Sequence, residues 1–206
     1  MKRTLILDVQ SYWHAGTGLG SGSDLDALVA RTAGGLPYLP GRTVRGLLRD
    51  VMELAAQLGE FSPELVERCF GSGLTEAVDS DNRVAVLEEG RFSTRPGQLR
   101  VEDARLGDLP PNAPAWEAWA HAHPRSVDVF VTSIASTAMK DGLVVPHTLR
   151  RIEVAVPVIL SAQLEGPADD WADAVERSLP YLRCLGSHRN RGLGRVHAYL
   201  LAGATA

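Results

Sequence analysis

Residues 150–166, RRIEVAVPVILSAQLEG, form the stretch that most limits how this chain can fold. Apolar side chains alternate along it with other residues, which is the pattern of a strand with one buried face. The buried face is expected to carry Ile152, Val154, Val156, Val158 and Leu160, and the other face Arg151, Glu153, Pro157 and Ser161. Because Pro157 has no amide hydrogen, the strand is expected at a sheet edge or with a bulge.

Two amphipathic segments provide helices to cover such a sheet. Residues 41–59 carry apolar side chains every third or fourth position and end at a glycine, and residues 168–186 repeat the pattern with a kink expected at Pro180. Further strands are expected at 4–10, 82–90, 127–134 and 194–202. The order β-α-β, insertion, β-α-β predicts an α+β fold with a ferredoxin-like (RRM-like) core.

These elements predict a single domain over residues 1–206. Its core is expected at about 1–90 and 149–202, and a thumb-like insertion at about 91–148 would separate the second and third core strands. A glycine- and serine-rich loop at about 11–40 is longer than most loops in compact domains. Long loops of this kind often carry function.

Composition fits a globular protein rather than a disordered or membrane-spanning chain. Hydrophobic residues make up 45% of the 206 positions, and no apolar run approaches the 18 residues of a membrane span. Cys69 and Cys184 both lie in apolar helical patterns, so they are expected to be buried thiols rather than a disulfide. We therefore expect a cytoplasmic protein without a membrane partner.

The charges are segregated along the chain. The formal net charge is −4, yet residues 183–195 hold four arginines and no acid, while residues 165–176 hold five acids and no base. A concentrated basic patch governs binding to polyanions more than the net charge does. The arrangement therefore predicts contact with nucleic acid.

Arginines also mark the start of the first helix. Arg42, Arg45 and Arg49 are spaced to share one face, and cations near a helix N-terminus oppose its dipole. A phosphate bound there would remove the conflict and accept hydrogen bonds from free backbone amides; a solvated arginine face is the alternative. Gly46 lies in the middle of this helix, where close approach of RNA or tight packing on the sheet would each explain it.

The basic stretch near the C-terminus, GSHRNRGLGRV at 186–196, is rich in glycine. Glycines allow backbone amides to converge on an anion, and arginines add charge and planar surfaces for stacking; a flexible surface turn is the alternative. The expected RNA-binding residues are His14, Arg42, Arg45, Arg49, Lys140, His147, Gly186, His188, Arg189, Arg191, Gly192, Gly194 and Arg195. Residues 138–148 are expected to be an exposed excursion that meets RNA or another subunit.

Other candidate sites are weaker. The segment GTGLGSG at 16–22 lacks the GxGxxG spacing of a dinucleotide fingerprint and is not obviously followed by a helix. No HxxxH, CxxC or carboxylate cluster indicates a structural metal site. His121 and His123 could bind a metal, but a solvated loop is the expected reading.

Two motifs together resemble the RAMP superfamily of CRISPR-associated RNA-binding proteins. The first, GLPYLPGRTVRGLLRDVM at 35–52, is similar to the family's Pro-Gly segment before its first helix. The second, LRCLGSHRNRGLGRV at 182–196, is similar to its glycine-rich loop before the last strand, and RCFGS at 68–72 resembles its Phe-Gly element. The resemblance implies a ferredoxin-like fold and RNA binding through both segments.

Within that superfamily the chain most resembles the repeated backbone subunit of type III effector complexes. WHAG at 13–16 matches an apolar-His-x-Gly segment, and Asp26 falls near the family's catalytic aspartate, with Asp24 as a rival. The resemblance implies guide RNA, target RNA, other RAMP subunits and copies of the chain itself as partners. It also implies cleavage of target RNA with Mg²⁺ or another divalent cation.

Chemistry allows this role for Asp26 without requiring it. A carboxylate can act as a base or help to hold hydrated Mg²⁺, which typically takes one or two carboxylates plus phosphate oxygens. In a binding-only structural subunit, Asp26 would instead shape the loop. A metal-independent guide-processing ribonuclease is a further alternative, with His14 and His188 as its candidate residues.

Overall fold

The computed structural model describes residues 1–20, 25–72, 76–78, 84–86, 95–107, 112–167 and 170–201. Asp24 lies outside these ranges. Among the described residues, no helix combines the length and apolar character needed to cross a membrane.

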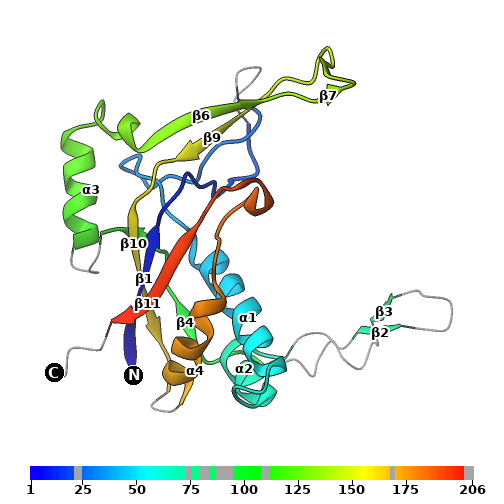
Figure 1. Ribbon diagram of the computed structural model, residues 1–206. Helices are drawn as coiled ribbons and strands as arrows, with labels where there is room; N and C mark the ends of the chain where they lie inside the picture. The colour runs from blue at the N-terminus through cyan, green and yellow to red at the C-terminus, as the bar shows by residue number, and fades with distance from the viewer. Residues whose placement is uncertain are drawn as a thin grey trace.

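One antiparallel sheet forms the centre of the fold (Figure 1). Its order is β11 (Val196–Leu201), β1 (Lys2–Val9), β10 (Ile159–Glu165) and β4 (Arg100–Val101), and β5 (Arg105–Leu106) also pairs with β10. Leu7 of β1 lies opposite Leu160 of β10 on one side and Ala198 of β11 on the other. This register places small and branched apolar residues on the same covered face.

Three helices pack against that face. They are α1 (Gly41–Gln57), α2 (Pro63–Phe70) and α4 (Trp171–Ser178), and Figure 1 shows α1 and α4 side by side. Ser62 caps α2 by accepting a hydrogen bond from the Glu64 amide, and Pro63 occupies the first turn. The apolar stripe of α1 is buried as expected, from Val44 to Ala55. Burial of these stripes provides most of the helices' stability.

The order of these elements confirms the α+β, ferredoxin-like expectation, but the second core strand was misplaced. Residues 84–86, expected to belong to the core, form β3 (Val84–Val86), which pairs with β2 (Glu76–Val78) in a separate two-stranded sheet. The core position beside β10 is taken by β4 and β5. The core strands β5 and β10 are separated by residues 107–158, whereas the insertion was expected at about 91–148. Two-residue strands such as β4 and β5 are too short to show an alternating pattern.

The long strand expected at 150–166 is two strands with different partners. β9 (Arg150–Ala155) pairs with β6 (Val131–Ser136), whereas β10 belongs to the central sheet. The break falls around Pro157, which cannot donate a ladder hydrogen bond. The helix expected at 168–186 likewise ends early, because α4 stops at Ser178 and Pro180 lies in the short helix η3 (Leu179–Tyr181).

The insertion consists of a helix and a long hairpin (Figure 1). After α3 (Asn112–Ala122) and the short helix η2 (Val127–Phe130), β6 and β9 form a hairpin that lies across one end of the sheet. β7 (Met139–Lys140) and β8 (Leu143–Val144) pair at its tip. We call residues 137–148 the tip. The tip exposes Met139, Leu143 and Val144, each by more than 60%.

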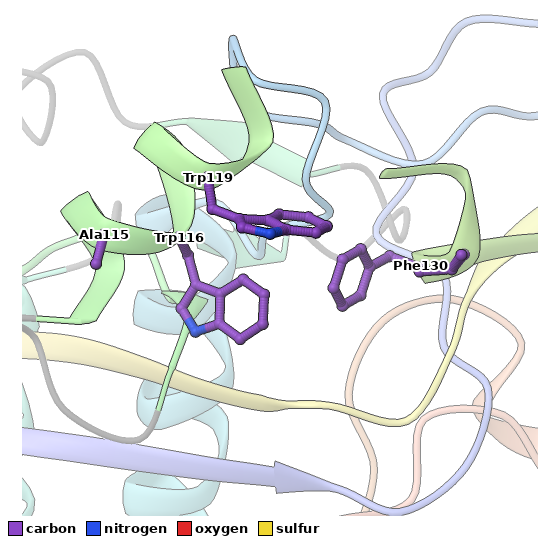
Figure 2. A pocket seen from close by; sticks show the side chains of 5 residues that line it. Ala115, Trp116, Trp119 and Phe130 are labelled. Carbon is purple, nitrogen blue, oxygen red and sulfur yellow. The ribbon is translucent and has the colours of Figure 1, made fainter. Parts of the chain in front are cut away.

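Aromatic side chains fill the junction between α3 and η2. Trp116 and Trp119 meet edge to face with ring centroids 5.6 Å apart, and each also meets Phe130 edge to face. Figure 2 shows these rings turned toward a common space. With Ala115 and Val129 they line a cavity of about 590 Å³, which we call the aromatic cavity. Among the described residues, no charged side chain lines it.

The long loop after β1 is attached to β9 by backbone hydrogen bonds. Trp13 exchanges two hydrogen bonds with Ala155, at 3.0 and 2.8 Å, and the Glu153 amide donates to the Ala27 carbonyl at 3.0 Å. The buried carboxylate of Glu153 strengthens this attachment. It accepts from the Val29 amide at 3.0 Å and from the Arg31 guanidinium at 2.5 Å.

We predict that Glu153→Ala destabilises the protein by about 2–4 kcal/mol. The change leaves the buried Val29 amide without its acceptor and leaves the Arg31 guanidinium only the exposed Asp128 carboxylate at 3.8 Å, and such losses cost several kcal/mol together. Urea denaturation followed by circular dichroism measures the free energy of unfolding. Glu165→Ala is the matched control, because its 4.0 Å pair with Lys2 is exposed and is expected to contribute less than about 1 kcal/mol. Equal, small effects of both changes would contradict this role of Glu153.

Candidate nucleic-acid interface

Three segments that lie far apart in the sequence surround one open cavity of about 370 Å³, which we call the basic cavity. They are the loop after β1, the first half of α1 and the glycine-rich loop before β11. The lining residues are His14, Ala15, Gly16, Pro40, Arg42, Thr43, Gly46, Leu47, Asp50, Gly186, Ser187 and Arg189. The two segments that carry the expected motifs therefore meet at one place.

The glycine-rich loop is held firmly at both ends. The Ser187 amide donates to the His14 carbonyl at 2.8 Å, and the Gly194 amide donates to the Tyr12 carbonyl at 2.7 Å. At Gly186, where φ is 76°, a Cβ atom would lie 2.5 Å from the His14 carbonyl oxygen. Glycine is needed there because the two loops approach so closely. Both ends of the loop are thus attached to the loop after β1, and Gly186, Ser187 and Arg189 line one side of the basic cavity.

The three arginines of α1 do not act together as the sequence suggested. Arg42 lines the basic cavity. Arg45 instead donates to the carbonyls of Leu99 and Phe70 and lies over the Phe70 ring. Arg49 donates to Glu53 at 2.6 Å, one turn further along the helix. The structure therefore assigns Arg45 to packing and pairs Arg49 with an acid, and it leaves Arg42 facing the cavity.

The first amide of α1 is already occupied. The Gly41 amide donates to the Asp103 carboxylate at 2.8 Å, and Asp103 lies between β4 and β5. This carboxylate supplies the negative charge that a helix N-terminus favours. The first amide of the helix is therefore not free to bind the phosphate that was expected there. The space open to a ligand lies along α1 between Arg42 and Asp50.

Gly46 faces this open space. A Cβ atom built on Gly46 would meet no other atom within 4 Å, apart from its own helix. Tight packing on the sheet is thus excluded as the reason for a glycine here. A glycine in a helix costs about 1 kcal/mol relative to alanine. The space above Gly46 is therefore open to a ligand that approaches the helix backbone.

His14 is buried and hydrogen-bonded although it lies in a loop. It is only 3% exposed, and its Nδ1 bonds to the Glu153 carbonyl oxygen at 2.6 Å, so Nδ1 carries the hydrogen. Nε2 lies next to Gly16, where a Cβ atom would come within 2.9 Å of it. The ring of His188, in left-handed backbone at φ 58°, has its centroid 6.3 Å away.

Asp26 lies outside the basic cavity, against β9. Its amide donates to the Arg151 carbonyl at 2.8 Å, and its Oδ2 accepts from the Arg151 amide at 2.8 Å. The side chain is exposed, and no described residue bonds to Oδ1. The described residues contain no group of three or more His, Cys, Asp or Glu side chains placed to hold a metal. Oδ1 could still provide the single carboxylate ligand of a cation whose other ligands are phosphate oxygens and water.

The remaining candidates lie further out. Lys140 and His147 are exposed on the tip, and Arg191 is exposed in the short helix η4 (Arg189–Arg191). Gly192 and Gly194 have positive φ in the same loop. Arg195 lines a different cavity, together with His197 of β11. Among the cysteines, Cys69 is buried as expected and Cys184 is only half-buried.

Sequence reasoning missed Asp50, Asp103 and Glu153. Glu153 was expected on the solvent face of a strand, but the loop after β1 covers it. Asp103 falls in a stretch expected to be irregular. Asp50 had a detectable signal, because it follows Arg42 and Gly46 at intervals of four residues and so shares their row on the helix.

The RAMP superfamily model matches residues 6–197. The chain belongs to the RAMP superfamily. This match spans both arginine-containing segments and the insertion between them, which confirms the resemblance drawn from the motifs. No curated protein is similar enough in sequence to be counted as a relative.

Several solved structures share this RAMP fold at low sequence identity. A chain of the type III-B Cmr-beta complex in its apo state has a TM-score of 0.64 at 10% identity, covering 98% of this chain and 97% of its own length. A chain of the same complex bound to cognate target RNA has a TM-score of 0.61 at 11% identity, with 97% of both chains covered. A chain of a type IV-B CRISPR complex has a TM-score of 0.58 at 16% identity, covering 100% of this chain and 92% of its own.

Proposed function

We propose that this RAMP protein is a backbone subunit of a CRISPR effector complex that holds guide RNA in the basic cavity. The observation that carries the proposal is the pair Arg42 and Arg189, which line the cavity from two different segments. Within the described residues, neither side chain has a hydrogen bond or an ion pair. Two cationic side chains without partners, next to the open helix surface at Gly46, can contact the phosphates of a nucleic-acid strand. Similarity to chains from CRISPR complexes, one of them bound to target RNA, supports the same function.

We predict that Arg42→Ala and Arg189→Ala each weaken RNA binding and its dependence on salt. Each lost phosphate contact lowers the slope of log affinity against log salt by about 0.7 for a single strand. Arg191→Ala, in the same loop, is expected to act in the same direction. Fluorescence anisotropy with a labelled single-stranded RNA over a series of KCl concentrations measures the slope.

Arg177→Ala is the matched control, since this α4 arginine pairs with Asp173 and Glu60 and does not line the basic cavity. The control should leave the slope unchanged. An unchanged slope in both cavity variants would contradict RNA binding at this place.

The proposal extends to cleavage of target RNA by Asp26. Support comes from its exposed carboxylate, whose Oδ1 is not used by any described residue, and from its place beside the hairpin rather than inside the basic cavity. Guide binding and cleavage would then rest on different residues. A divalent cation at Asp26 would stabilise charge that develops on the phosphate. In the binding-only alternative, the Arg151 hydrogen bonds are the whole role of Asp26.

We predict that Asp26→Asn lowers target cleavage by about 10²–10⁴, the range usual for a lost acid-base group. Asparagine can still accept from the Arg151 amide, so guide and target binding should stay within about twofold. The assay compares wild type, Asp26→Asn and Asp24→Asn in an assembled complex with matched labelled RNA, with Mg²⁺ and with EDTA.

Full cleavage by Asp26→Asn would contradict the assignment, and loss only in Asp24→Asn would move it two residues upstream. Cleavage that persists in EDTA would favour the histidine-based alternative with His14 and His188. Absence of cleavage by wild type in a complex that binds target would favour the binding-only subunit.

We also infer how copies of the chain meet. The tip exposes Met139, Leu143 and Val144. The aromatic cavity is lined by residues of α3 and η2, and Figure 1 shows α3 and the β7 end of the hairpin at opposite ends of the insertion. An exposed apolar segment and an unfilled apolar cavity on opposite ends of one molecule suit a head-to-tail contact. Asp128 beside the cavity pairs with Arg31 at 3.8 Å, but its side chain is 79% exposed, so it can also meet Lys140 on the tip of another copy. We propose that the tip of one copy enters the aromatic cavity of the next.

Two variants test this contact without RNA. Leu143→Asp removes the tip's apolar character and Val129→Asp places a charge at the aromatic cavity; both residues are at least 67% exposed, so folding should be preserved. We expect wild type to assemble with rising concentration in sedimentation velocity and each variant to remain monomeric. An equal mixture should form dimers and nothing larger, because only one intact pair of surfaces remains.

Leu58→Asp is the control, since Leu58 is 60% exposed at the end of α1, away from both surfaces. It should assemble as wild type does. A mixture of the two variants that stays monomeric would contradict the tip-to-cavity contact.

A further inference from the structure

The basic cavity contains a charge that phosphate binding does not explain. Asp50 lines it together with Arg42 and Arg189. Within the described part of the chain, the Asp50 carboxylate has no hydrogen bond or ion pair, and neither arginine pairs with it. An acid beside a phosphate backbone repels it, so its presence in this cavity calls for a second kind of contact with the ligand.

Three residues of α1 form one row along the cavity. Arg42, Gly46 and Asp50 follow each other at intervals of four, so about 12 Å of helix separates the first from the last. Gly46 leaves the middle of the row open, as no atom lies within 4 Å of its virtual Cβ. A ligand that lies against Gly46 would therefore meet a cation at one end and a carboxylate at the other.

The chemistry of a carboxylate defines what it meets. An ionised carboxylate only accepts hydrogen bonds, so its partner must be a donor, and phosphate oxygens are not donors. RNA offers two kinds of donor near its phosphates: the ribose 2′-hydroxyl and the amino or imino groups of the bases. The 2′-hydroxyl belongs to the same sugar-phosphate backbone that Arg42 and Arg189 would hold, and it distinguishes RNA from DNA.

We propose that Asp50 accepts a hydrogen bond from a ribose 2′-hydroxyl of the bound strand and so makes the basic cavity selective for RNA. This inference rests on the proposed RNA binding at the same cavity. The arginines supply affinity that any phosphate backbone would share. Asp50 supplies the discrimination, because a strand without the hydroxyl would leave the carboxylate unpaired and close to phosphates.

The test distinguishes recognition of the 2′-hydroxyl from a purely electrostatic effect of Asp50. Affinities of wild type, Asp50→Ala and Glu53→Ala are measured for an RNA and for the same sequence with 2′-fluoro riboses, which lack the donor. Wild type should prefer the hydroxyl form, and Asp50→Ala should reduce that preference by about tenfold or more, as expected for loss of one hydrogen bond to a charged group. Glu53→Ala removes an acid from the same helix outside the cavity lining and should leave the preference unchanged.

Other outcomes would contradict the inference about Asp50 or the proposed function. If Asp50→Ala raises both affinities by one common factor, Asp50 acts only through charge and the inference is wrong. A further arm compares oligouridine with oligocytidine, because carboxylates accept hydrogen bonds from the cytosine amino group. If Asp50→Ala changes that ratio and not the 2′-fluoro ratio, the base is the partner and the sugar assignment fails. If wild type binds none of these strands, the proposed function itself fails.

Discussion

The candidate nucleic-acid interface depends on the hydrogen bonds that the buried carboxylate of Glu153 accepts. It joins the loop after β1 to β9 through the Val29 amide and the Arg31 guanidinium, and its own carbonyl holds the His14 ring. The loop can then support the glycine-rich segment, because Ser187 bonds to the backbone of His14. Through its carboxylate and its backbone carbonyl, Glu153 therefore links the hairpin of the insertion to a wall of the basic cavity. A buried acid is tolerated because both of its oxygens have partners.

The structure also explains how an acidic chain can present a basic surface. Several arginines form ion pairs with nearby acids: Arg49 with Glu53, Arg68 with Asp170 and Arg177 with Asp173. Arg42 and Arg189 form no ion pair with any described residue and share one cavity. The local balance of paired and unpaired charge, rather than the net charge of −4, determines where a polyanion can bind.

The sequence was most informative where a local pattern decides the structure. The stripe of α1 and the glycines of the C-terminal loop were recognisable, since helix periodicity and left-handed backbone have local signatures. β4 and β5 were missed because two-residue strands depend on β10 for their pairing. The common arginine face failed for a similar reason. Arg45 is drawn to the carbonyls of Leu99 and Phe70, and such tertiary contacts have no signature in the sequence.

The most direct test of the central claim is ultraviolet cross-linking of the protein to a bound guide-length RNA, followed by mass spectrometry of the linked peptides. Binding in the basic cavity predicts cross-links in the loop after β1, in the first half of α1 and around Arg189. Ferredoxin-like proteins can also bind RNA on the open sheet face, which here carries Tyr199 and His197 on β11. Cross-links confined to β1, β10 and β11 would contradict the account.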